Sequence, residues 1–118
     1  MRRLTLAGII PVILLLATGQ AAAHAFLERA EPRVGNKVAT PPQQVTLWFT
    51  EKLETAFSSL TVTNAAGQRV DTGKARVSGN QISIAVRPGG TGTYRVNWHV
   101  LSADTHRTDG DFTFQVGQ

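Results

Sequence analysis

The sequence contains no cysteine, which excludes disulfide bonds, thiolate metal ligands and cysteine-based zinc sites. Its single methionine is Met1, so thioether ligands are absent from the rest of the chain. Lysine and arginine form no cluster interleaved with aromatic residues, and the composition therefore does not indicate a nucleic-acid-binding surface. A chain without disulfides has to be stabilised by its apolar core.

The first 23 residues have the pattern of a secretory signal peptide. Two arginines give a positive start, residues 4–17 are mostly apolar, and three alanines before residue 24 offer the small residues of a cleavage site. An uncleaved membrane anchor is the alternative, but the apolar run is short for a transmembrane helix. We therefore predict that residues 1–23 are removed during export and that residues 24–118 form one domain, not embedded in the membrane.

Removal of the signal peptide changes the size and charge of the chain. The remaining segment has 118 − 23 = 95 residues, and the loss of Arg2 and Arg3 lowers the Lys+Arg count from 12 to 10 against 8 acidic residues, a net charge of +2. A chain of this length buries roughly 60–65% of its unfolded surface, which is enough for an independent fold. The mature protein is therefore expected to be only mildly basic.

Short segments of alternating apolar and polar residues predict an all-β protein. Such alternation is typical of half-buried strands, and no amphipathic helical pattern is present. Turn signals at 64–67, 78–80 and 109–110 separate the segments, and the 64–67 turn predicts a hairpin. We predict a Greek-key antiparallel β-sandwich of about seven strands. The predicted strands are 25–30, 43–51, 59–63, 81–86, 93–101 and 112–116, with weaker candidates at 68–71 and 74–77.

A candidate metal site follows the longest predicted strand. Asp104 and His106 are two residues apart, so an extended backbone projects both side chains on the same side. His24 would become the first residue after cleavage, where its α-amine and imidazole can chelate one metal ion. Three nitrogens and one carboxylate oxygen suit Cu(II), whereas Zn(II) prefers a tetrahedral site. We expect His24, Asp104 and His106 to bind Cu(II), with Glu51 as a further or outer-sphere ligand.

Each of these residues also has an ordinary structural interpretation. Asp104 is typical of a turn-forming residue, His106 of an exposed loop and Glu51 of an exposed strand end. His24 is explained equally well as an accident of the cleavage site. His99 lies one position after Trp98 in the predicted strand, so its side chain should leave on the opposite side from the inward-facing apolar residues. We therefore expect it on the outer face, in a structural or solvated role.

Several motifs of the chain resemble the CopC family of periplasmic copper-binding proteins. The similarity covers nearly all of residues 24–118, and its most specific part is a mature N-terminal His combined with the Asp-x-His turn. The motifs are His24-Ala25-Phe26-Leu27, the turn from Pro32 to Gly35, Val45-x-Leu47-x-Phe49-Thr50-Glu51, Gly92-Thr93-Tyr94-Arg95-Val96-x-Trp98, Ser102-x-Asp104-x-His106 and Gly110-x-Phe112-x-Phe114-x-Val116.

The resemblance implies an immunoglobulin-like or cupredoxin-like β-sandwich with a Cu(II) site at His24, Asp104 and His106, and with the family's strand-end Glu at Glu51. It also implies a periplasmic, mostly monomeric copper carrier or buffer, not an enzyme, that acts in copper resistance or homeostasis. An inner-membrane CopD-type copper transporter is the partner that it suggests. Some relatives carry a Met-rich loop that binds Cu(I), but residues 62–77 here contain neither Met nor His. We therefore expect a member that binds only Cu(II).

Two other classes of function are compatible with the sequence. In the first, His24 and His106 form the histidine brace of a copper oxidase or monooxygenase, although Asp104 would then occupy an equatorial position that oxygen chemistry needs. The sequence also lacks a flat aromatic substrate surface. In the second, the chain is a metal-free structural domain of the cell envelope. Failure of the processed protein to bind any metal would favour that interpretation.

Overall fold

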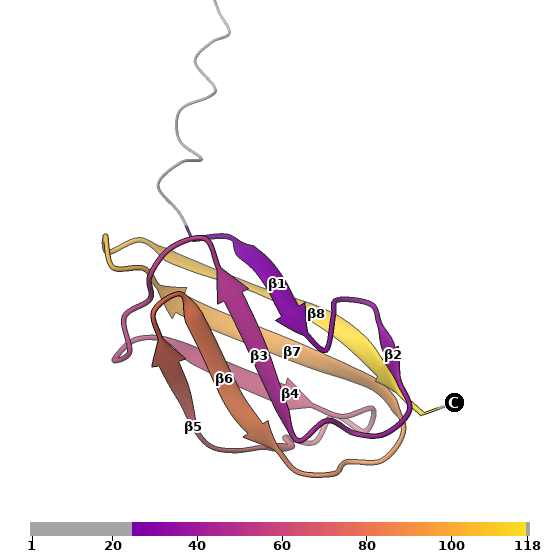
Figure 1. Cartoon of the computed structure of the whole chain (residues 1–118). Coiled ribbons are helices and arrows are strands. Elements are labelled where there is room, and N and C mark those ends of the chain that lie inside the picture. The colour runs from indigo at the N-terminus through magenta and orange to yellow at the C-terminus, as the bar shows by residue number, and fades with distance from the viewer. Residues whose placement is uncertain (1–24, 118) are drawn as a thin grey trace, which may run out of the picture.

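Two four-stranded sheets face each other in the computed structural model, which describes residues 25–117 (Figure 1). The strand orders are β1-β3-β6-β5 and β2-β8-β7-β4. All neighbouring strands are antiparallel except β2 and β8, which are parallel. The strands are β1 (Leu27–Glu31), β2 (Lys37–Val38), β3 (Gln44–Phe49), β4 (Ser59–Thr63), β5 (Asp71–Ser78), β6 (Gln81–Val86), β7 (Gly92–Leu101) and β8 (Arg107–Val116).

The predicted all-β sandwich is confirmed, with eight strands in place of about seven. No helix occurs within residues 25–117, so this part of the chain has none that could span a membrane. The predicted segments 59–63 and 81–86 coincide with β4 and β6. The alternation of apolar and polar residues located these strands, because side chains at every second position of a strand face the same side and can be buried in the core.

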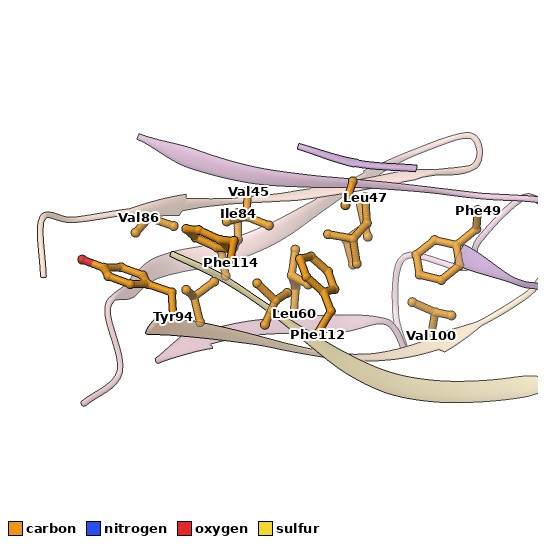
Figure 2. Close-up of a cluster of buried hydrophobic side chains, with 14 of the residues drawn as sticks. Val45, Leu47, Phe49, Leu60, Ile84, Val86, Tyr94, Val100, Phe112 and Phe114 are labelled. Atoms are coloured by element: carbon orange, nitrogen blue, oxygen red, sulfur yellow. The ribbon is translucent and has the colours of Figure 1, made fainter. Parts of the chain in front are cut away.

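The core lies between the two sheets and is made by the alternating apolar residues of five strands (Figure 2). Burial of these side chains provides the main favourable free energy of folding in a protein without disulfides. The buried hydroxyl of Tyr94 donates to the carbonyl oxygen of Gly90 at 2.7 Å, so its polar end is satisfied. The residues are Val45, Leu47, Phe49, Leu60, Val62, Ile82, Ile84, Val86, Tyr94, Val96, Val100, Phe112, Phe114 and Val116.

The hairpin connection predicted at 64–67 forms but is short: Thr63 and Arg69 make an isolated antiparallel bridge, and the N–H of Val70 donates to the carbonyl oxygen of Val62 at 2.9 Å. β4 pairs with β7, and the chain then crosses to the other sheet, where β5 pairs with β6. Asp71 contributes to this crossing, because its carboxylate accepts a hydrogen bond from the backbone N–H of Val62 at 2.8 Å. Of the two weaker candidates beyond the turn, 74–77 lies inside β5, whereas 68–71 contributes only Asp71 to it; β5 is irregular between Thr72 and Arg76.

The turn predicted at Asp109-Gly110 is wrong, because both residues lie inside β8. This strand begins at Arg107, five residues before the predicted start, and pairs along its whole length with β7. Gly110 faces Trp98, whose ring lies so close that a Cβ at position 110 would be 2.6 Å from it. The glycine therefore serves the packing of the indole ring and not a turn. The actual connection between β7 and β8 is the segment 102–106.

Candidate metal centre

The β7–β8 turn, residues 102–106, carries two of the predicted ligands and is closed by its own backbone. The N–H of Ser102 donates to the carbonyl oxygen of His106 at 2.9 Å, and the N–H of Thr105 donates to that of Ser102 at 2.8 Å. Thr105 has a φ of 72°, the left-handed region that β-branched residues rarely adopt. The closed turn places the side chains of Asp104 and His106 side by side.

Asp104 and His106 form a half-exposed acid–imidazole pair. Asp104 Oδ1 lies 3.3 Å from His106 Nδ1, and the two side chains are 46% and 44% exposed. The hydroxyl of Ser102 donates to the same carboxylate oxygen. This hydrogen bond, with a smaller contribution from His106, holds the pKa of Asp104 below its ordinary value. The pair therefore presents a carboxylate and an imidazole, two ligand types that suit a borderline divalent metal.

The loop after β3 packs against the β7–β8 turn and brings Glu51 to the same end of the sandwich. The N–H of Ala103 donates to the carbonyl oxygen of Lys52 at 2.8 Å, and Leu53 forms an isolated β-bridge with Ser102. Glu51 precedes Lys52 and is exposed. Glu51 thus lies in the loop, two residues beyond the end of β3 and one residue from a backbone contact with the turn.

The start of the described chain lies against the same rim. Thr108, two residues beyond His106, donates its hydroxyl to the carbonyl oxygen of Ala25 at 3.1 Å. Phe26 and Thr50 exchange hydrogen bonds, since the N–H of Phe26 donates to Thr50 Oγ1 and the N–H of Thr50 donates to the Phe26 carbonyl, each at 2.9 Å. Figure 1 shows the segment leading into β1 and the β7–β8 connection at one end of the sandwich.

The four predicted ligands have different positions in the structure. Asp104 and His106 are in contact, Glu51 is exposed on the adjoining loop, and His24 lies outside the described residues. Within residues 25–117, no three His, Cys, Asp or Glu side chains are grouped closely enough to hold a metal ion. Hence Glu51, Asp104 and His106 do not by themselves form such a group. Completion of the site by His24 stays a prediction.

His99 lies on the outer face of its sheet, as its parity predicts, and is 69% exposed. It faces Asp109 across the β7–β8 ladder, with 3.9 Å between His99 Nδ1 and Asp109 Oδ2. Asp109 is 71% exposed. Exposure of both side chains fits the solvated role expected of His99, and it makes this histidine a useful control for His106.

Two residues at this end were given no role by sequence reasoning. Ser102 is fully buried and contacts Asp104, and the only sequence signal for it was its place in the Ser-x-Asp-x-His motif. Thr108 binds the backbone of Ala25, and nothing in the sequence indicated this. A contact between residues 83 positions apart depends on how the sheets pack, which local patterns do not report.

Comparison with known proteins gives a consistent result. The CopC domain family matches residues 27–117. Copper resistance protein C of Xanthomonas campestris pv. juglandis is 36% identical over 117 residues, covering 92% of this chain and 91% of that protein. The crystal structure of CopC from Methylosinus trichosporium OB3b has a TM-score of 0.73 at 30% identity, covering 79% of this chain and 93% of that one.

A second solved structure extends the comparison. PcoC, described as a methionine-rich copper resistance protein from Escherichia coli, has a TM-score of 0.70 at 32% identity and covers 80% of this chain and 99% of its own. The match to the family spans the whole sandwich, from the first residue of β1 to the residue after β8. The sequence match, the fold and the motifs agree, and the chain belongs to the CopC family.

Proposed function

We propose that this protein binds one Cu(II) ion in the periplasm and carries or buffers it. The observation that carries the proposal is the contact between Asp104 and His106 at the rim where Ala25 is held by Thr108. His24 is joined to Ala25 by one peptide bond, and consecutive Cα atoms are about 3.8 Å apart. A link this short supports the proposal that His24 can reach the Asp104–His106 pair.

The donor set fits Cu(II) better than Cu(I). The α-amine and imidazole of His24, the imidazole of His106 and the carboxylate of Asp104 are nitrogen and oxygen donors, which suit Cu(II). Cu(I) prefers thiolates and thioethers, and residues 24–118 contain neither cysteine nor methionine. This composition contrasts with PcoC, whose description names it methionine-rich. We propose a Cu(II)-only member of the family.

Processing after Ala23 is part of the mechanism that we propose. Only a free α-amine on His24 closes the chelate ring, so the signal peptide has to be removed before the site is complete. Binding also requires that the amine and both imidazoles lose their protons, and copper affinity therefore falls as the pH falls. Glu51 acts as an additional or outer-sphere ligand on the adjoining loop. The proposal contains no catalytic step.

The physiological role that we propose is copper homeostasis or resistance. An exported, monomeric carrier with a solvent-accessible site at one rim suits transfer of Cu(II) to a membrane protein, and a CopD-type inner-membrane transporter is the partner that the family resemblance suggests. The half-exposed Asp104 and His106 support such transfer, because an acceptor can approach them without unfolding the sandwich.

The test compares two preparations in a Cu(II) titration followed by electron paramagnetic resonance. One preparation begins at His24, and the other carries one extra residue before it. We expect tight one-to-one binding with nitrogen hyperfine structure in the first and loss of the tight site in the second. The variant His106→Ala should also lose the site, whereas the control His99→Ala should keep it. Equal binding by both preparations would contradict the N-terminal chelate.

A further inference from the structure

The side chain of Ser102 is completely buried and lies between the two described ligand residues. It is 0% exposed, although both neighbouring ligands are half-exposed. Its hydroxyl donates to Asp104 Oδ1, and its oxygen also lies 3.1 Å from the carbonyl oxygen of His106. A serine hydroxyl has a single hydrogen, so these two acceptors share one donor. Ser102 thus links the carboxylate of one ligand to the backbone of the other.

The backbone around Ser102 is fixed independently of its hydroxyl. The N–H of Ser102 donates to the His106 carbonyl, and an isolated bridge joins Ser102 to Leu53 on the neighbouring loop. The N–H of Ala103 adds a hydrogen bond to Lys52. Because these contacts use backbone atoms, they survive removal of the Ser102 side chain. The hydroxyl is therefore available to the side chain of Asp104, and it is the strongest of the hydrogen-bond partners of this carboxylate, ahead of the side chain and the backbone N–H of His106.

We propose that Ser102 is a positioning residue of the copper site, whose buried hydroxyl holds the Asp104 carboxylate beside His106 before the metal arrives. The inference rests on the proposed function and adds a reason why the site binds Cu(II) without first reorienting the Asp104 side chain. A half-exposed aspartate otherwise rotates among staggered conformations, and ordering it on binding costs free energy. Groups that orient metal ligands typically change metal affinity by about 10–100-fold when removed.

The arrangement also assigns different tasks to the two carboxylate oxygens. Oδ1 accepts the Ser102 hydrogen bond and lies next to His106 Nδ1, whereas Oδ2 does not receive the Ser102 hydroxyl. A carboxylate held in this way is expected to bind the metal through one oxygen. Removal of the hydroxyl releases Oδ1 and should change the electron paramagnetic resonance parameters of bound Cu(II) together with the affinity.

The experiment uses the processed protein beginning at His24 and the substitution Ser102→Ala. We expect Cu(II) affinity, measured by competition with a chelator, to fall about 10-fold or more. The matched control is Ser58→Ala, which removes the hydroxyl that accepts a hydrogen bond from the N–H of Leu101 at 3.1 Å. This control weakens the same end of the sandwich without contacting either ligand, and its affinity should stay within about twofold of the unmodified protein.

A double-mutant cycle separates positioning from a general structural effect. If Ser102 acts through Asp104, Ser102→Ala should have no further effect on affinity in an Asp104→Ala background. An equal loss in both backgrounds would overturn the proposal while leaving copper binding intact. Absence of Cu(II) binding by the unmodified protein would overturn the proposed function itself.

A measurement on the unmodified, metal-free protein covers the case in which Ser102→Ala does not fold. Three-bond NMR couplings report the χ1 distribution of Asp104. We expect a single staggered conformation, because the Ser102 hydrogen bond selects one. Averaging over several conformations would overturn the proposal, since the carboxylate would then not be held before the metal binds.

Discussion

The hydroxyl of Thr108 donates a hydrogen bond to the carbonyl oxygen of Ala25, and this joins the beginning of the sandwich to its last strand. Ala25 is itself buried, at 1% exposure. The contact is 3.1 Å long and lies two residues after His106 along β8. It therefore holds Ala25 against the residue two positions after His106.

Replacement of Thr108 by valine tests this connection, because valine keeps the shape of the side chain but removes the hydroxyl. We expect a loss of about 1 kcal/mol in the free energy of unfolding, the typical net value of one hydrogen bond. Cu(II) affinity should also fall several-fold, because the segment carrying His24 is held less firmly. Urea denaturation and chelator competition measure the two effects. The control Thr108→Ser retains the hydroxyl. A loss of Cu(II) affinity in this variant as large as the loss in Thr108→Val would contradict the explanation.

Asp71 is expected to be important for stability and irrelevant to copper. Its side chain is 4% exposed and accepts hydrogen bonds from Val62 N–H and from Arg69. Removal of a buried, hydrogen-bonded carboxylate in Asp71→Ala should cost about 2 kcal/mol. The control Asp109→Asn alters an exposed carboxylate and should change stability by less than about 0.5 kcal/mol. Unchanged urea midpoints in Asp71→Ala would show that the Arg69–Asp71 pair contributes nothing.

The contribution of Asp71 should also depend on pH. The hydrogen bond from Arg69 is the largest cause that lowers the pKa of Asp71 below its ordinary value, and the N–H of Val62 adds to it. The stabilising effect is therefore complete above the ordinary value of about 4 and disappears as the pH falls through the lowered one. We expect the stability difference between the unmodified protein and Asp71→Asn to shrink progressively as the pH falls below about 4. A difference that grows with acidification would contradict this assignment.

Gly110 should not tolerate a side chain. An alanine Cβ would lie 2.6 Å from the ring of Trp98, and this overlap is expected to cost about 1–3 kcal/mol. The substitution Trp98→Leu removes the ring, so Gly110→Ala should cost less in that background. Denaturation of the four proteins in this cycle measures the coupling. An equal cost in both backgrounds would mean that the indole is not the obstacle.

Thr105→Gly is expected to stabilise the protein, although glycine usually destabilises. Thr105 has a φ of 72°, and such strain in a β-branched residue costs of order 1–3 kcal/mol. Glycine relieves this backbone strain, but its greater freedom in the unfolded chain lowers the free energy of unfolding by about 0.4–1 kcal/mol. The net result should be an increase of about 1 kcal/mol in the free energy of unfolding. Ala103→Gly is the control in the same turn, where φ is not positive, and it should destabilise. Thermal or urea denaturation distinguishes the two signs.

The strands of the core were predictable because their information is local. In β3 and β6, every second residue is an aliphatic or aromatic core residue, and side chains on a strand alternate between its faces. Thr46 is an exception: it is buried although its position in the alternation is polar, and β3 lies inside its sheet between β1 and β6, which local sequence does not report. Alternation identifies the face of a strand but not how completely its neighbours cover it.

Strand pairing was less predictable because it depends on distant partners. The turn after β4 has the residues of a hairpin, and Gly67 adopts a φ of 80°, yet β4 pairs with β7 and β5 joins the other sheet. Similarly, Asp109-Gly110 has the composition of a turn but lies inside β8, where Gly110 makes room for Trp98. The residue types of a dipeptide limit its backbone conformations, and the packing of the whole fold selects one of them.

The sequence by itself determined the strands of the core and the kinds of donor available to a metal, because side-chain chemistry and period-two alternation belong to the local chain. The spacing of Asp104 and His106 also put their side chains on the same side, but only the tertiary structure decided that Ser102 is fully buried and that Ala25 is bound by Thr108. The Ala25–Thr108 contact joins segments that are far apart along the chain, and Ser102 is covered where the loop containing Leu53 bridges to it, so no local pattern encodes either.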